Sequence, residues 1–174
     1  MPRIVSLILL IFILLFASFP LLAEQTAIAA PVPAQILSAK KVFISNAGTD
    51  SMSMAVFKRA GDPDQPYNQF YAAMKSWGKY EIVSAPADAD LIFEIRFTAP
   101  VGQYGSISIA EPQLGLTLRD VKTHFILWTF VEPVQGAFRK GTWEKNFAEG
   151  MSNLMADLRH LTASTVATAD STPK

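Results

Sequence analysis

The chain has no cysteine among its 174 residues. Disulfide bonds and metal sites built on thiolates are therefore excluded. A bacterial lipoprotein carries its lipid on a cysteine that follows the signal sequence, so we expect no lipid anchor of that kind. An exported domain without disulfides must be held together by its hydrophobic core, and about 145 residues can bury roughly two-thirds of their unfolded surface.

An excess of either charge is also lacking. Fifteen Lys and Arg residues balance fifteen Asp and Glu residues, and neither sign is concentrated in one stretch. This balance excludes the basic surface that is typical of nucleic-acid-binding proteins. The only histidines are His124 and His160, and no His-x-x-x-His spacing or third ligand accompanies them. The sequence therefore predicts no nucleic-acid partner and no metal site.

Catalytic motifs are missing too. Residues 136–142 are similar to a phosphate-binding loop, but Thr142 stands where that loop requires a lysine. Asp120, His124 and a serine such as Ser106 make the best hydrolase candidate, yet no nucleophile elbow supports it. We therefore predict no catalytic or cofactor-binding residues. The sequence favours a non-enzymatic protein over a hydrolase with an unrecognised active site.

The beginning of the chain has the layout of a secretory signal peptide. Arg3 precedes a predominantly apolar run over residues 4–16, Pro20 then interrupts the helix, and small residues follow. Cleavage after Ala29 fits the small residues found there, and cleavage after Ala23 is the alternative. The competing interpretation is that the longer apolar run from Ile4 to Ala23 is retained as a membrane anchor, because its length approaches that of a transmembrane helix.

These features divide the chain into four predicted parts. They are a signal peptide (1–29), a Pro/Ala-rich linker with little to bury (30–39), a folded domain (40–162) and a disordered tail (163–174). The domain is expected to be periplasmic or extracellular after cleavage of the signal peptide.

Two segments have the spacing of amphipathic helices. Residues 66–77 carry apolar side chains every three or four positions, with Pro66 in the first turn and Gly78 at the expected left-handed C-terminal position. A second apolar stripe begins after Asn146 and continues to Leu161. Because each helix has one apolar stripe, we expect both to cover the same face of a sheet.

Several segments have the composition or alternation of β-strands. The predicted strands are residues 41–45, 80–83, 91–98, 114–118 and 123–131. Three loops are predicted, over residues 46–65, 99–112 and 132–144. The first contains a partial element near residues 52–58, and residues 106–110 of the second could pair as an edge strand. The order β-α-β-β-β-β-α predicts an α+β two-layer sandwich with a mixed sheet of about five strands. The helix after the first strand favours a parallel first pair, and the last two strands form a hairpin.

Two stretches resemble small exported bacterial domains. One reads Trp-Gly-Lys-Tyr-Glu-Ile-Val from Trp77 and continues as Ala-Asp-Ala-Asp-Leu-Ile-Phe-Glu-Ile from Ala87. The other reads Leu-Arg-Asp-Val-Lys-Thr-His-Phe-Ile-Leu-Trp from Leu118 to Trp128. The group includes uncharacterised envelope lipoproteins and, more distantly, the amino-terminal domain of the Tol-system translocation protein. The resemblance implies an envelope-located α/β sandwich that binds other components, and it brings no catalytic residues.

One short segment is a candidate contact site for a partner. Phe138, Arg139, Lys140 and Trp143 place aromatic side chains beside cations in a predicted loop, although Trp143 could instead pack against the core. We expect a binding or assembly module whose loops contact an envelope protein or another cell-envelope component. Membrane contact is expected only if the signal peptide is retained.

Overall fold

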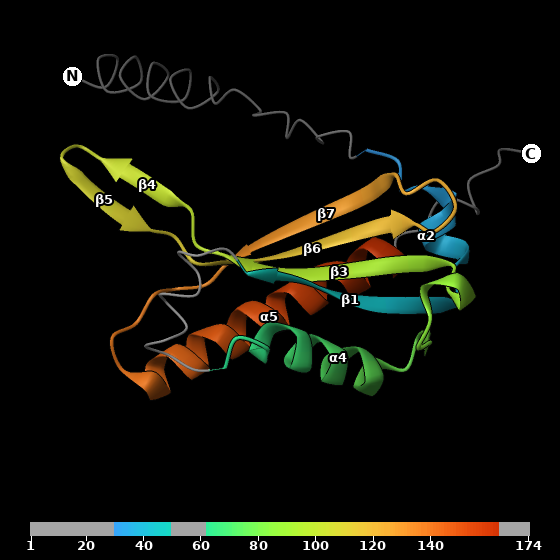
Figure 1. The fold of residues 1–174 in the computed structure, drawn as a ribbon, viewed down its shortest axis with the longest axis horizontal. Helices are drawn as coiled ribbons and strands as arrows, with labels where there is room; N and C mark the ends of the chain where they lie inside the picture. The colour runs from blue at the N-terminus through green and yellow to red at the C-terminus, as the bar shows by residue number, and fades with distance from the viewer. Residues whose placement is uncertain (1–29, 50–61, 164–174) are drawn as a thin grey trace, which may run out of the picture. The chain divides into compact units, whose positions relative to one another are not determined.

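The computed structural model describes residues 30–49 and 62–163. Figure 1 shows a sheet with helices on one side and a two-stranded hairpin that projects beyond it. The helices are α2 (Ala34–Ser38), α4 (Gln65–Trp77) and α5 (Lys140–Ala163), and η1 (Pro86–Asp88) is a 3₁₀ turn. The strands are β1 (Lys41–Thr49), β2 (Glu81–Ile82), β3 (Leu91–Thr98), β4 (Val101–Tyr104), β5 (Ile107–Ala110), β6 (Gln113–Asp120) and β7 (Ile126–Pro133).

The main sheet is mixed and has five strands, in the order β2-β1-β3-β6-β7. β1 is parallel to both β2 and β3, whereas β6 is antiparallel to both β3 and β7. The predicted α+β class is therefore confirmed, together with the parallel first pair and the final hairpin. The parallel pairing of β1 with β3 was not predicted, because local sequence does not show on which side of β1 a later strand inserts.

β3 shows why the sheet has one buried face. Leu91, Phe93, Ile95 and Phe97 are fully buried, while the residues between them are half-buried or exposed. Successive side chains of a strand point to opposite faces, so this alternation assigns each residue to one face. The register continues the pattern, because buried Leu118 and Leu116 of β6 lie opposite Phe93 and Ile95.

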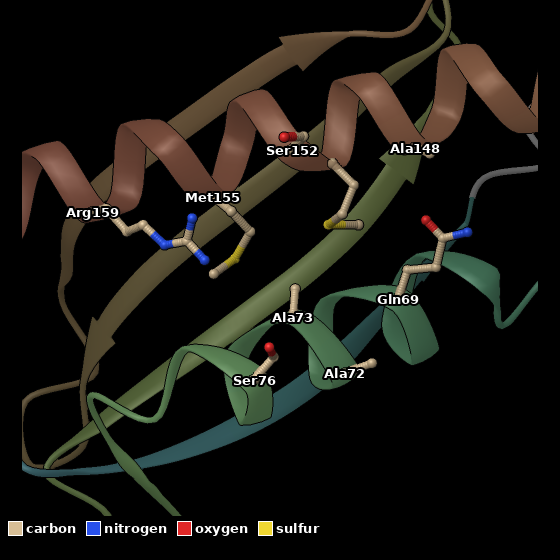
Figure 2. A pocket seen from close by; sticks show the side chains of 9 residues that line it. Gln69, Ala72, Ala73, Ser76, Ala148, Ser152, Met155 and Arg159 are labelled. Atoms are coloured by element: carbon tan, nitrogen blue, oxygen red, sulfur yellow. The ribbon is translucent and has the colours of Figure 1, made fainter.

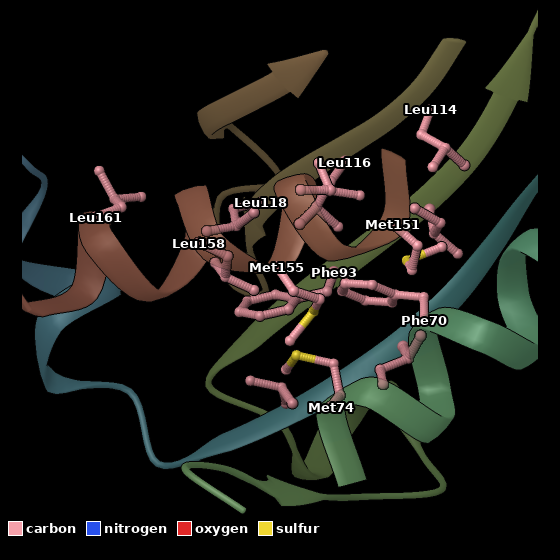
Figure 3. Packing of buried hydrophobic residues seen from close by; sticks show 14 of the residues in the cluster. Phe70, Met74, Phe93, Leu114, Leu116, Leu118, Met151, Met155, Leu158 and Leu161 are labelled. Carbon is pink, nitrogen blue, oxygen red and sulfur yellow. The ribbon is translucent and has the colours of Figure 1, made fainter. Parts of the chain in front are cut away.

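α4 and α5 cover the buried face of the sheet (Figure 1). Figure 3 shows Phe70 and Met74 of α4, and Met155 and Leu158 of α5, packed around Phe93 of the central strand. Each fully buried side chain of this size contributes about 1.5–3 kcal/mol relative to its exposed state. Gly78 ends α4 with a φ of 68°, in the left-handed conformation expected from the sequence.

α5 begins earlier than the sequence pattern predicted. We expected a loop up to residue 144 and a helix from Asn146, but the helix begins at Lys140. The reason is Trp143, which lies one turn before Phe147 and extends the same buried stripe. The apolar stripe of α5 is therefore longer than the one we read from the sequence.

The segment predicted as a linker contributes to the core. Residues 34–38 form α2, and Ile36 is fully buried. Asp90 then fixes the entry to β1, because its Oδ2 atom accepts hydrogen bonds from the backbone N–H groups of Lys40 (2.8 Å) and Lys41 (2.9 Å). The Pro/Ala composition of residues 30–39 did not indicate that this segment packs against the core, since a single buried isoleucine is enough to dock a short helix.

Some predictions lie outside the described residues. They are the signal peptide, the partial element near residues 52–58 and the tail, except for Ala163, which ends α5. Within the described parts, no helix is both long enough and apolar enough to cross a membrane.

Candidate interaction surface

The hairpin of β4 and β5 is the most unusual feature of the surface. These strands form a sheet of their own, joined by a turn in which Gly105 has a φ of 62°. Val101, Ile107 and Ile109 are 51%, 62% and 48% exposed. An isolated two-stranded hairpin is marginally stable in water, so such exposure of aliphatic side chains is typical of a surface that contacts something else.

Both faces of the hairpin carry an exposed aliphatic side chain, and one face also carries a polar pair. Val101 lies opposite Ala110, and the two share one face with Gln103 and Ser108, whose side chains are hydrogen-bonded to each other (3.0 Å). Ile107 and Ile109 lie on the other face, because directly paired residues point the same way and neighbours alternate. The sequence has no charged residue from position 99 to 110. This hairpin therefore differs from an ordinary solvated loop.

The base of the hairpin is joined to the loop between β7 and α5. Glu111 donates its backbone N–H to Pro100 O (2.8 Å), and Val134 donates its own to Pro112 O (2.8 Å). A pocket of about 480 Å³ lies where these segments meet, lined by residues 110–113 and 133–136. The base of the hairpin and this loop therefore meet at one end of the domain, from which the hairpin and the start of α5 extend in different directions (Figure 1).

Phe138 is the most exposed apolar side chain of this end. It is fully exposed, and it is followed by the exposed residues Arg139 and Lys140 at the start of α5. Lys140 Nζ lies 3.8 Å from Glu144 Oε1, a solvent-exposed pair that contributes little stability. The predicted contact residues Phe138, Arg139 and Lys140 are thus accessible, and their role remains a prediction.

Trp143 is not accessible, so its predicted contact role is wrong. It is 1% exposed, and its ring packs edge-on against Phe97, with 5.9 Å between ring centroids. Phe147 lies 6.0 Å away on the next turn of α5. The alternative that Trp143 folds onto the core is therefore correct, because the start of α5 turns this residue toward the sheet.

The opposite end of β6 and β7 contains the hydrolase candidates. Asp120 caps the turn there, since its Oδ1 atom accepts hydrogen bonds from the backbone of Lys122 (3.1 Å) and from the backbone and hydroxyl of Thr123 (2.7 and 2.8 Å). These bonds, chiefly those from Thr123, lower the pKa of Asp120. Asp120 therefore acts as a turn former, and His124 ends the same turn with a φ of 60°.

Ser106 does not join Asp120 and His124. It lies at the tip of the β4–β5 hairpin, whereas Asp120 ends β6, whose eight residues begin at the base of that hairpin. At about 3.4 Å per residue, the length of β6 alone separates them by roughly 24 Å. The three residues therefore do not form a triad. Among residues 30–49 and 62–163, no group of three His, Asp or Glu side chains is placed to hold a metal ion.

A groove between α4 and α5 is the second hollow of the surface. Figure 2 shows Ala72, Ala73 and Ser76 of α4 facing Ala148 and Ser152 of α5. It measures about 400 Å³, and Arg159 at one end stacks over Trp77, 5.6 Å from its ring centroid. These side chains are too short to fill the space between the two helices, so the groove is explained by the residue sizes at this position.

The face of the sheet away from the helices carries polar side chains on β3 and β6, beside the exposed Val131 of β7. The half-buried side chains of Glu94 and Arg119 form an ion pair across β3 and β6. Arg96 lies over Gly115, where a side-chain Cβ would come within 2.9 Å of Arg96 Nε. In contrast to the hairpin, this face therefore has polar side chains that pair with one another or cover the backbone.

Comparison with known proteins gives fold neighbours only. No family model and no curated protein matches the chain. Among solved structures, the chain is similar to a DUF330 protein of Xanthomonas campestris (12% identity, 82% of this chain and 94% of that one, TM-score 0.49). It is also similar to the PelC dodecamer of Paraburkholderia phytofirmans (14%, 75% and 92%, 0.42) and to uncharacterised lipoprotein B of Nitrosomonas europaea (13%, 80% and 94%, 0.35). Lipoproteins are thus among its structural neighbours, and function does not follow from fold.

The hairpin surface was missed by the sequence interpretation. We treated residues 99–112 as a loop and allowed a strand only at its end. Two signals were present, namely the alternation Ser-Ile-Ser-Ile from Ser106 and the absence of charge from position 99 to 110. Neither signal shows that the hairpin projects from the domain, because that depends on where β3 and β6 end.

Proposed function

We propose that this chain is an exported cell-envelope protein that acts as a non-enzymatic binding or assembly module. The signal-like beginning of the sequence supports export to the periplasm or beyond. The observation that carries the proposal is the uncharged hairpin, which has exposed aliphatic side chains on both faces and lies at the same end of the domain as the β7–α5 loop that carries the fully exposed Phe138. The Tol-system resemblance remains a prediction from sequence.

The free-energy cost of exposing apolar side chains favours a contact surface at the β4–β5 hairpin over a loop without a binding role. Exposed aliphatic groups do not stabilise a two-stranded hairpin, and they raise the risk of aggregation. Covering them would contribute roughly 25 cal/mol for each Å² of apolar surface removed from water. A partner that covers this end therefore gains binding energy without reorganising the core.

Site-specific photo-crosslinking in cells tests the proposal. The full chain carries a photoreactive residue at position 107, 138 or 131, where Val131 is 53% exposed on β7 and serves as the control. We expect a discrete adduct, of protein or lipid, from positions 107 and 138 and none from position 131. Equal labelling at all three positions, or no adduct from the hairpin end, would refute the binding function.

A further inference from the structure

The chemistry of the exposed end indicates what kind of partner it fits. A groove or a sheet edge on another protein usually covers one face of an added strand or ribbon. Here Val101 is exposed on one face of the hairpin, and Ile107 and Ile109 are exposed on the other. An environment that surrounds the ribbon suits this distribution better than a surface that covers one side.

The unpaired backbone limits how deep the hairpin could enter such an environment. Each outer edge of the two-stranded sheet has backbone groups without a partner strand. In the hydrocarbon core of a bilayer, each unsatisfied group costs several kcal/mol. In the interfacial layer, headgroups and water satisfy these groups, while aliphatic and aromatic side chains still reach apolar surroundings.

The charges at the start of α5 complement an anionic interface. Arg139 and Lys140 follow Phe138 directly, and the sequence has no acidic residue between Glu132 and Glu144. The first turn of α5 has no acidic residue either, and the nearest one, Glu144, forms the solvent-exposed pair with Lys140. Glu111 is the acidic residue of this end that adjoins the hairpin, and it lies at the base of the hairpin, away from the tip.

We infer that this end of the domain docks peripherally on an anionic lipid surface. The tip of the β4–β5 hairpin and Phe138 enter the headgroup boundary, and Arg139 and Lys140 contact lipid phosphates. The inference rests on the proposed binding function and names its partner. It adds a route to the membrane that does not depend on a retained signal peptide.

Vesicle flotation tests the inference. Every core residue in the part of the chain that the structure describes lies between Ile36 and Leu161, so a chain of residues 30–174 holds this core and excludes the apolar leader. It is mixed with vesicles of phosphatidylcholine alone or of phosphatidylcholine with phosphatidylglycerol. We expect flotation with the anionic vesicles and progressive loss of flotation as salt is raised, because salt screens the cation–phosphate attraction.

Variants at the two ends of the domain provide matched controls. Phe138→Ser should weaken binding roughly tenfold, and Arg139→Gln with Lys140→Gln should weaken it roughly fivefold for each cation. Phe125, at the opposite end, is 72% exposed and close in sequence to Lys122 and His124. Phe125→Ser should therefore leave binding unchanged, and unchanged thermal unfolding confirms that each variant is folded.

Three outcomes would overturn the lipid inference. They are absence of flotation with anionic vesicles, equal loss in Phe138→Ser and Phe125→Ser, and binding that is insensitive to salt. If flotation fails but position 138 crosslinks to an envelope protein, the binding function stands with a protein partner. If instead the chain sediments as an oligomer that Ile107→Ser with Ile109→Ser dissociates, the surface is an interface between copies.

Discussion

Replacing Trp143 tests the assignment of this residue to the core. Trp143→Ala removes a side chain that is 1% exposed and that contacts Phe97 and Phe147. Truncation of a buried aromatic residue costs about 3–5 kcal/mol, of which each aromatic ring contact supplies about 0.5–1.5 kcal/mol. A domain of this size has only about 5–15 kcal/mol of stability, so the variant should lose a large share of it.

The assay is urea unfolding of residues 30–174 followed by circular dichroism. Trp143→Phe retains one aromatic ring and should lower the free energy of unfolding by about half as much. It can therefore be measured even if the alanine variant does not fold. Phe138→Ala, five positions earlier and fully exposed, should change stability by less than about 0.5 kcal/mol. A cost below about 1 kcal/mol for Trp143→Ala, or an equal cost for Phe138→Ala, would refute the assignment.

Three further predictions concern local structure. Asp90→Ala should cost about 1–2 kcal/mol near neutral pH after allowance for solvent exposure, because two backbone N–H groups lose their acceptor. Those hydrogen bonds lower the pKa of Asp90, so the difference from wild type should shrink as pH falls through the acidic range, and pH-dependent urea midpoints that stay parallel would contradict it. Burial raises the pKa of Tyr80 to about 12, so stability should fall as pH rises from about 10 to 12, and Tyr80→Phe should reduce that fall in alkaline unfolding curves. Gly78→Ala should cost about 1 kcal/mol, because alanine is strained at a φ of 68°, and an unchanged melting temperature would count against this reasoning.

The candidate surface lies outside the hollows that usually hold ligands. The groove between α4 and α5 is explained by small side chains that leave the space between the helices unfilled, and Ser106 at the hairpin tip is far from Asp120 and His124 at the far end of β6. The hairpin end has no such structural explanation, because its aliphatic side chains support neither the core nor the main sheet. We therefore base the function of the domain on this end.

Strong local periodicity predicted individual elements well. β3 matches the predicted residues 91–98, and α4 begins one residue before the predicted start at Pro66. In both segments the apolar spacing, together with Pro66 and Gly78 in the helix, is sufficient to define the element. α2 was missed because a single buried residue, Ile36, carries no periodicity.

Composition and local spacing were enough to define the α+β class, the common face of the two main helices and the absence of thiol chemistry. These properties depend on composition and on spacing within short segments. Only the tertiary structure decided that β3 inserts beside β1, that Trp143 is buried and that the β4–β5 hairpin is exposed on both faces. Pairing and burial depend on residues far apart in the chain. Two similar aromatic residues, Phe138 and Trp143, could therefore be told apart only by what lies next to them in space.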